Sequence, residues 1–282
     1  MTYAEILAEG RNVLAGAGIA SPEVDAFYLF ESAAGTCRAE YLLKKDQQAP
    51  DDIKEKFRRF IEQREAHVPY QYILGEADFC GYKFKVDENV LIPRLDTEVL
   101  AWETIKLIPE GSVGSKVLDM CTGSGCIGIT IKKERPAVKL CLSDISENAL
   151  KLAQENAANN LADMAEDIEF ILSDLFESIA PVFDIIVSNP PYVTEREFAA
   201  LDPEVRDHEP ELALLAGADG LDVYKRLIPG AAEHLNEGGF LMLEIGCSQA
   251  AAVEGLMRQS GFSDICIKKD LAGLDRVVCG RK

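Results

Sequence analysis

Residues 188–192 read Ser-Asn-Pro-Pro-Tyr and follow the run Phe-Asp-Ile-Ile-Val, which is typical of a buried strand. The two prolines disfavour the α-region for the residues before them, so the strand should end in a stiff corner. The side-chain oxygen of Asn189 and the carbonyl oxygen of Pro190 are then two fixed acceptors that suit a planar NH₂ group. Tyr192 offers a flat face for stacking. The pattern indicates chemistry on an amide or nucleobase nitrogen; the alternative is a proline turn with a capping asparagine.

A planar NH₂ group is a poor nucleophile because its lone pair is delocalised. Two acceptors that bind both N–H groups orient the nitrogen and favour the charge that builds on it during transfer. No side chain near the corner is an obvious strong base. His208 is the nearest histidine in sequence, and we expect it to be structural. The proton is therefore expected to leave to solvent after transfer.

A glycine-rich loop follows the apolar segment 117–120, where Gly123, Gly125 and Gly128 are spaced as Gly-x-Gly-x-x-Gly. This spacing predicts a close backbone approach to a ligand at a helix N-terminus, and a nicotinamide dinucleotide or an empty turn are the simplest interpretations. Asp119, directly before the loop, disfavours an anionic pyrophosphate and favours a cationic or zwitterionic ligand. The Asp-x-x-x-Gly-x-Gly pattern resembles the first motif of S-adenosylmethionine-dependent methyltransferases, whose cofactor carries a sulfonium and an ammonium group.

Two further acids follow the next two predicted strands. Asp144 lies about 20 residues beyond the loop, where a carboxylate can accept hydrogen bonds from both ribose hydroxyls. The alternative for Asp144 is a place in the N-cap region of the helix that starts at Ser146. Asp174 is expected either to meet the adenine amine, with Leu175 against the ring, or only to begin a polar loop.

Alternating strands and helices must position these residues. Strands are expected at 116–120, 139–145, 168–174, 183–189 and 238–246, with two short strands closing the chain. This alternation predicts an α/β fold with a mostly parallel sheet, covered on both faces and binding ligands beyond the carboxyl ends of its strands. A long polar loop is expected after the proline corner. Residues 2–75 show helical spacing and predict a small bundle, and 76–93 predict a β-hairpin.

Composition limits the partners. The 282 residues include 29 Lys and Arg against 48 Asp and Glu, a net charge of −19, which disfavours direct nucleic-acid binding and suits a basic protein partner. The eight cysteines form no Cys-x-x-Cys pair, so we expect no metal site and free thiols in a reducing cytosol. No signal peptide is visible and no apolar run approaches the roughly 18 residues of a membrane span. We therefore expect a cytoplasmic protein with no membrane partner.

Five segments together resemble the protein-(glutamine-N5) methyltransferases of peptide chain release factors. They are 90–98, 117–129, 188–192, 208–221 and 238–246. The Asn-Pro-Pro-Tyr motif alone is shared with DNA adenine and several RNA amino-methyltransferases, whereas its combination with Ile-Pro-Arg at 92–94 and Glu-Pro-Glu-Leu-Ala-Leu at 209–214 is more specific. The resemblance implies methyl transfer from S-adenosylmethionine to the glutamine of a Gly-Gly-Gln motif in a release factor.

The resemblance also implies a domain plan and a set of site residues. A helical bundle at 1–75 would recognise the substrate, a hairpin at 76–94 would link it, and 95–282 would form a Rossmann-like methyltransferase domain. Asn189 and Pro190 would bind the glutamine amide, with Pro191 and Tyr192 shaping the pocket. The expected cofactor-binding residues are Asp119, Cys121, Thr122, Gly123, Ser124, Gly125, Asp144, Asp174, Leu175 and Asn189.

Two departures from the family pattern stand out. Cys121 replaces the first loop glycine, and Leu95-Asp96 replaces a more usual Pro-Glu. Three alternatives remain at this stage: a ribosomal-protein glutamine methyltransferase, which would share every catalytic motif, a nucleic-acid amino-methyltransferase, which should have a basic cleft, and a non-enzymatic S-adenosylmethionine-binding module, which need not keep the corner.

Overall fold

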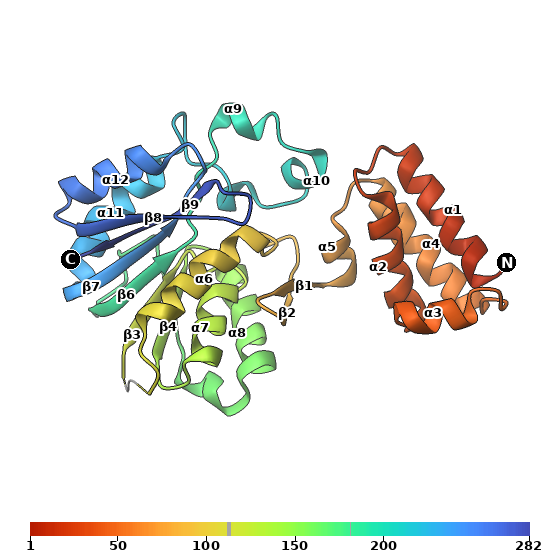
Figure 1. The fold of residues 1–282 in the computed structure, drawn as a ribbon, viewed down its shortest axis with the longest axis horizontal. Helices are drawn as coiled ribbons and strands as arrows, with labels where there is room; N and C mark the ends of the chain where they lie inside the picture. The colour runs from red at the N-terminus through yellow and green to blue at the C-terminus, as the bar shows by residue number, and fades with distance from the viewer. Residues whose placement is uncertain (112–113, 181) are drawn as a thin grey trace. The chain divides into compact units, whose positions relative to one another are not determined.

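The computed structural model describes residues 1–111, 114–180 and 182–282. The chain forms two compact units (Figure 1). Met1–Gly75 and Asp202–His208 make the first, and Glu76–Leu201 with Glu209–Lys282 makes the second. The segment 202–208, expected as part of a long polar loop, therefore belongs with the helical N-terminal residues. The β-hairpin belongs with the sheet.

The first unit is helical. Its helices are α1 (Tyr3–Gly16), α2 (Pro22–Ala34), α3 (Arg38–Lys44), α4 (Asp51–Glu65), α5 (Tyr70–Leu74) and α10 (Pro203–Arg206). Thr2 and Glu5 form a capping box that fixes the start of α1. Phe30 is fully buried and meets the edges of Tyr3 and Phe57. These aromatic contacts bring α1, α2 and α4 together around one small core.

A buried ion pair joins parts of this unit that are far apart in sequence. Arg64 of α4 is 3% exposed and donates to Asp25 of α2 at 2.7 Å. Arg64 also pairs with Glu204 of α10. Burial raises the pKa of Asp25, although Arg64 opposes this effect. Because an unpaired buried charge is costly, Arg64 holds α10 against α2 and α4.

The second unit contains a hairpin and a larger sheet. The hairpin pairs β1 (Glu76–Phe79) with β2 (Tyr82–Lys85). In the described part of the chain the larger sheet has seven strands in the order β5-β4-β3-β6-β7-β9-β8. These strands are β3 (Lys116–Met120), β4 (Lys139–Asp144), β5 (Glu169–Leu172), β6 (Phe183–Ser188), β7 (Leu235–Glu244), β8 (Ser263–Lys269) and β9 (Asp275–Arg281). The sheet is parallel from β5 to β7, and β9 then pairs antiparallel with both β7 and the edge strand β8. The predicted α/β fold and the positions of its strands are confirmed.

Helices connect the strands. They are α6 (Leu95–Leu107), α7 (Cys126–Glu134), α8 (Glu147–Leu161), α11 (Asp222–His234) and α12 (Ala250–Gln259), with the short elements η1 (Ala162–Asp167), α9 (Glu195–Phe198) and η2 (Glu211–Ala213). The long polar loop expected after the corner contains three short helical elements, α9, α10 and η2. A capping box at Thr194 starts α9.

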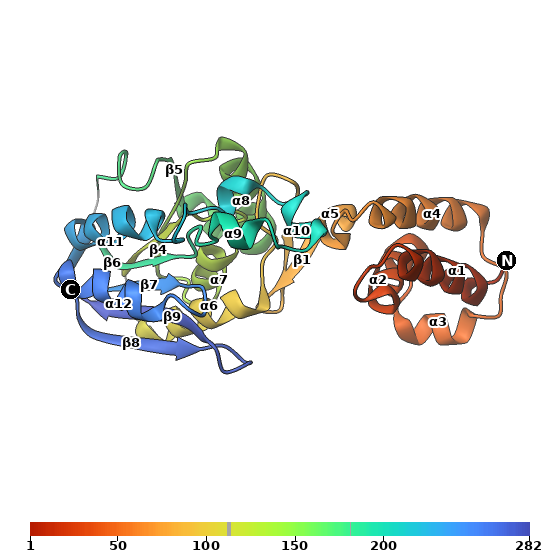
Figure 2. The same cartoon turned by 90° about the horizontal axis from the view of Figure 1, so that it is seen from above.

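Neighbouring residues of the central strands enter opposite halves of the core. Val117 of β3 packs in the cluster that contains residues of α6, α7 and α8, whereas Leu118 packs with residues of α11 and α12. Ile185 and Ile186 of β6 divide in the same way. This alternation follows from the two-residue period of a strand. It makes the sheet the middle of three layers, with α11 and α12 side by side on one face (Figures 1 and 2).

The point where the chain order reverses lies at β3. This strand sits between β4 and β6, and all three are parallel. Met120 at its carboxyl end pairs with Ser143 of β4 on one side and Ser188 of β6 on the other. The loops after β3 and β6 therefore separate there, which is where open α/β sheets bind ligands.

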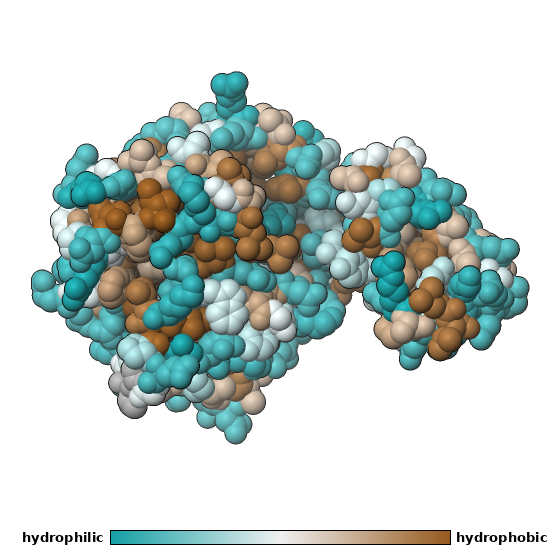
Figure 3. All heavy atoms as spheres, viewed as in Figure 1, coloured by the Kyte–Doolittle hydropathy of each residue, from teal (hydrophilic) through white to brown (hydrophobic). Residues whose placement is uncertain are grey.

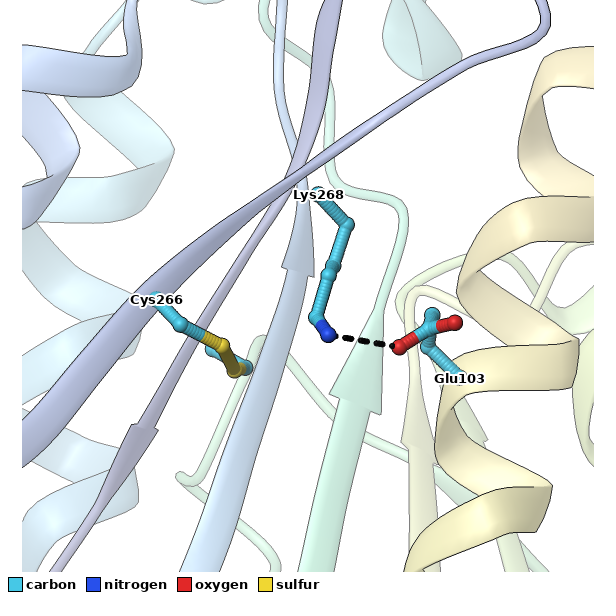
Figure 4. The surroundings of a disulfide bond; sticks show 4 residues. Glu103, Cys266 and Lys268 are labelled. Atoms are coloured by element: carbon cyan, nitrogen blue, oxygen red, sulfur yellow. Dashed lines mark ion pairs between the residues drawn. A yellow bond between two sulfur atoms is a disulfide. The ribbon is translucent and has the colours of Figure 1, made fainter.

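A disulfide joins the edge strand β8 to its neighbour β9, which corrects the expectation of free thiols throughout. Cys266 of β8 lies opposite Cys279 of β9 in the strand register, with a Cα–Cα distance of 5.3 Å. Figure 4 shows this disulfide together with Lys268, which pairs with Glu103 of α6 at 3.1 Å. The pairing depends on strand register, which sequence spacing did not reveal. The other six cysteines are free.

Polar side chains cover much of the surface drawn in Figure 3, with apolar patches between them. The most exposed large apolar side chains include Leu43 in the first unit and Leu271 in the turn between β8 and β9. Within the described ranges, the helices all fall short of the length and apolar character needed to cross a membrane.

Candidate active site

A cavity of about 360 Å³ lies beyond the carboxyl ends of β3, β4 and β6 in the second unit. Nine of the expected site residues line it: Cys121, Thr122, Gly123, Ser124, Asp144, Asp174, Leu175, Asn189 and Pro191. Segments 88–94 and 210–215 contribute further lining residues. Asp119, Gly125, Pro190 and Tyr192 do not line it. The cavity therefore unites the glycine loop, both strand-end acids and the proline corner.

Asp119 lies beneath the glycine loop and shapes it. Its side chain is fully buried, and its Oδ2 accepts hydrogen bonds from Thr122 Oγ1 at 2.7 Å and from the Gly128 amide at 2.9 Å. Burial raises the pKa of Asp119 to about 7. A Cβ atom on Gly128 would lie 2.4 Å from a methyl group of Leu142, so the third glycine lets α7 pack closely on the sheet. Asp119 thus ties the loop to the first turn of α7.

The loop backbone explains how a cysteine can replace the family's first glycine. Cys121 has φ = +58°, in the left-handed region that favours glycine. Gly123 and Gly125 follow with φ of +53° and +81°. Cys121 therefore keeps the backbone conformation of a glycine at some energetic cost. Burial raises the pKa of its thiol far above the usual range.

Asp144 contacts both the glycine loop and Ser146, the residue that caps α8. Its Oδ2 accepts a hydrogen bond from the Gly123 amide at 2.9 Å, and its Oδ1 accepts one from the Ser146 amide at 2.9 Å. Ser146 caps α8 through the amide of Ala149. Burial raises the pKa of Asp144. Because each carboxylate oxygen has a second acceptor position, the same side chain can also bind ribose hydroxyls.

The charges around the cavity suit a nucleoside without phosphates. Within the described residues, the arginines and lysines that line it are Arg94 and Arg226. Arg226 pairs with Asp174 at 2.8 Å, and Arg94 pairs with Glu209. Both cations are thus already neutralised, and neither is left for a pyrophosphate. The acids and the apolar Leu175 fit the ribose and adenine of S-adenosylmethionine.

Asn189 presents one unused acceptor at the cavity. Its Nδ2 donates to Thr97 Oγ1 of α6 at 3.3 Å. Its Oδ1 is buried and has no hydrogen-bond partner in the described part of the chain. The side-chain oxygen that the sequence predicts to bind a substrate NH₂ group is therefore free to accept one.

The proline corner is held by residues that the sequence did not single out. Gln249 donates from Nε2 to the carbonyl oxygens of Tyr192 at 2.9 Å and Gly220 at 3.2 Å. The Gly246 amide donates to Gln249 Oε1 at 2.9 Å. In the sequence, only the position of Gln249 shortly after the predicted strand 238–246 marks this residue.

Tyr192 points toward the core instead of lining the cavity. Its ring packs against the cluster beneath α11 and α12, and its hydroxyl donates to Glu244 Oε1 at 3.3 Å. Burial raises the pKa of the Tyr192 hydroxyl above its usual range. The stacking role expected for Tyr192 stays a prediction.

Two sequence motifs meet at Glu209, whose side chain is 1% exposed. Its Oε2 accepts a hydrogen bond from the Ile92 amide at 3.1 Å, and its Oε1 pairs with Arg94. This carboxylate joins the segment 90–98 to the segment 208–221, and both segments contribute to the cavity wall. His208 is not among the lining residues.

Comparison with known proteins identifies the family. Residues 96–202 match the model of the methyltransferase small domain, and residues 5–75 match that of the PrmC N-terminal domain. A release factor glutamine methyltransferase of Geobacter sulfurreducens is 38% identical over 99% of this chain and 96% of its own. One of Koribacter versatilis is 39% identical over 100% of this chain and 99% of its own. The chain belongs to the release factor glutamine methyltransferase family.

Members of this family are S-adenosylmethionine-dependent enzymes, as the glycine loop predicted. The fold is also found in more distant structures. A methyltransferase of Pyrococcus furiosus aligns with a TM-score of 0.55 at 16% identity, over 78% of this chain and 98% of that one. The Thermus thermophilus 16S rRNA methyltransferase RsmC, in complex with AdoMet and guanosine, aligns with a TM-score of 0.50 at 18% identity, over 73% of this chain and 55% of its own.

Proposed function

We propose that this protein methylates the side-chain amide nitrogen of the glutamine in the Gly-Gly-Gln motif of peptide chain release factors. The observation that carries the proposal is the unpartnered, buried Oδ1 of Asn189 at the cavity. This atom is a fixed acceptor at the position where the family resemblance expects the substrate amide. We infer that the reaction takes place in the cytoplasm, because translation takes place there.

The proline corner would perform the chemistry by orientation. Asn189 Oδ1 and the Pro190 carbonyl oxygen accept the two N–H bonds of the glutamine amide and favour positive charge on its nitrogen. S-adenosylmethionine, when bound, supplies the electrophilic methyl group. Holding the nitrogen in line with that group removes much of the entropic barrier to transfer. We expect no general base, and the proton leaves to solvent.

The glycine loop and the strand-end acids would hold the cofactor. The loop from Cys121 to Gly125 binds the methionine part, and Asp144 binds the ribose hydroxyls. Asp174 and Leu175 flank the adenine, although Arg226 already occupies one oxygen of Asp174. Asp119 acts from beneath by fixing the loop, as its contacts with Thr122 and Gly128 indicate.

The first unit would recognise the release factor. Residues 1–75 form the bundle, with 76–94 as a linker and 95–282 as the methyltransferase domain in the proposed division. The net charge of −19 supports a protein partner and argues against direct binding of nucleic acid.

The test replaces Asn189 by alanine. We expect Asn189→Ala to bind S-adenosylmethionine with wild-type affinity by calorimetry, and to transfer methyl groups to a release factor roughly 10²–10³ times more slowly, the effect of removing one fixed hydrogen-bonding group at a reacting centre. Asn159→Ala, on the exposed face of α8, is the matched control. Wild-type transfer by Asn189→Ala would refute the role of the corner.

A further inference from the structure

Gln249, directly before α12, uses its side-chain amide to join three separate backbone segments of the second unit. Its Nε2 donates to the carbonyl oxygens of Tyr192 at 2.9 Å and of Gly220 at 3.2 Å. Its Oε1 accepts from the Gly246 amide at 2.9 Å. Because an NH₂ group has two N–H bonds, the two carbonyls use both of them. A carbonyl can only accept and an amide N–H can only donate, so these three partners also fix the orientation of the Gln249 amide.

The backbone around this side chain leaves room for it and for little else. Gly220 has φ = +70°, and a Cβ atom there would lie 2.4 Å from the Tyr192 oxygen and 2.5 Å from Gln249 Nε2. A Cβ atom on Gly246 would lie 2.9 Å from Gln249 Oε1. A side chain at either glycine would therefore displace the Gln249 amide or the carbonyl that it binds. The close approach of both glycines shows that the three segments are packed around this one amide.

The backbone of the proline corner depends on anchors at its two ends. The two prolines have no N–H group to donate, so they cannot hold the corner by backbone hydrogen bonds of their own. At the first end, the Ser188 hydroxyl donates to the last carbonyl of β3 at 2.6 Å. At the other end, Gln249 binds the Tyr192 carbonyl. In the chain, the two proposed substrate acceptors, Asn189 Oδ1 and the Pro190 oxygen, lie between these anchors.

The same amide also holds the two ends of the segment 193–219, which leaves the corner and returns at Gly220. Val193, the first residue of this segment, forms a parallel bridge with Leu215. Val193 donates to one neighbour of Leu215 at 2.8 Å and accepts from the other at 2.9 Å. Leu215 lines the cavity. The corner and this wall of the cavity are therefore joined, and Gln249 fixes the chain on both sides of them.

We propose that Gln249 is a positioning residue for methyl transfer, which holds the acceptors of the corner at the correct place relative to the methyl donor. The inference rests on the proposed function, because it assumes that Asn189 Oδ1 and the Pro190 oxygen bind the glutamine amide. Gln249 is not among the described residues that line the cavity, and it acts through the backbone of Tyr192 and Gly220. Because a misplacement of about 1 Å at a reacting centre can cost about 10²-fold in rate, this restraint affects the chemical step.

Two substitutions at Gln249 separate this role from a purely structural one. Gln249→Glu keeps the length of the side chain and an oxygen that can accept the Gly246 amide, but at pH 8 the ionised carboxylate has no N–H to donate to the two carbonyls. Gln249→Met keeps the length and removes every polar contact. Gln259→Glu, at the exposed end of α12, adds the same charge and is the matched control for Gln249→Glu.

We expect Gln249→Glu and Gln249→Met to lower kcat for methylation of a release factor about 10- to 100-fold, because both release the far end of the corner. Calorimetric titration with S-adenosylmethionine gives the affinity and the number of folded sites, and each rate is divided by that number. The affinity should stay at the wild-type value, because the contacts of the glycine loop and of Asp144 are left in place. Gln259→Glu should match the wild type in both measurements.

A wild-type kcat per folded site for Gln249→Glu would overturn the inference. If Gln249→Met alone were slow, the contact with Gly246 would be the one that matters, and Gln249 would serve only the start of α12. A loss of cofactor affinity as large as the loss of kcat would also overturn it, because the effect would then not be confined to the corner. These outcomes leave the proposed function intact, whereas that function itself fails if the wild-type protein transfers no methyl group to a release factor.

Discussion

Replacing Asp119 by asparagine should change how the stability of the second unit depends on pH. Burial raises the pKa of Asp119 from 3.8 to about 7 in the folded protein. The unfolded chain ionises near the lower value, so folding is increasingly disfavoured as the pH rises from about 4 to 7. The stability associated with this raised pKa is present below pH 4 and is lost as the pH passes 7. The side-chain amide of the Asp119→Asn variant has no such titration.

The magnitude follows from the two pKa values. One pKa unit corresponds to about 1.4 kcal/mol, so the difference in unfolding free energy between Asp119→Asn and wild type should shift by about 3 kcal/mol in favour of the variant between pH 5 and pH 8. For a domain of this size that is a relative change in Tm of roughly 6–12 °C.

The single tryptophan makes the measurement selective. Trp102 is the only tryptophan in the chain and lies on α6, in the second unit. Its fluorescence during thermal unfolding therefore reports on the unit that contains Asp119. Asp163→Asn, which removes an exposed carboxylate on η1, is the control. A difference between Asp119→Asn and wild type that does not change with pH would refute the reasoning.

Three further substitutions or reactions test individual parts of the site. Asp144→Ala should weaken S-adenosylmethionine binding about 10- to 100-fold by calorimetry, because it removes the acceptor for two hydroxyls; unchanged affinity would exclude the ribose role. Glu209→Ala should lower stability by about 1–3 kcal/mol, because it leaves the buried Ile92 amide without its acceptor, and thermal unfolding followed by tryptophan fluorescence measures this loss. Cys121 should react with iodoacetamide far more slowly than the exposed Cys37, and mass spectrometry of labelled peptides would show equal rates if this account were wrong.

The elements around the site were predictable because their signals are local. The strand expected at 116–120 is β3, and the helix expected after the glycine loop is α7 at Cys126–Glu134. Apolar runs, glycines and prolines determine structure within a few residues, so their effect can be predicted from the sequence alone. The same local patterns predict that Asn189 and Asp144 lie at strand ends, and the sheet brings these ends together at one cavity.

The contacts that hold the corner could not be predicted in this way. Thr97 meets Asn189 across 92 residues of chain, and Tyr192 meets Glu244 across 52. Such pairs depend on how β6, β7 and α6 pack, and side-chain type alone does not reveal them. The disulfide between β8 and β9 was missed for the same reason, since it depends on which residues face each other across a ladder. These residues come together through the packing of separate elements, which leaves no local pattern in the sequence.

The most direct test of the central claim is tandem mass spectrometry of a release factor after incubation with this protein and methyl-labelled S-adenosylmethionine. Ribosomal proteins and tRNA are offered in parallel reactions. We predict that the label appears on the side-chain amide of the glutamine in the Gly-Gly-Gln motif, and that Asn189→Ala abolishes most of it. Label on a ribosomal protein or on tRNA, with none on the release factor, would contradict the account.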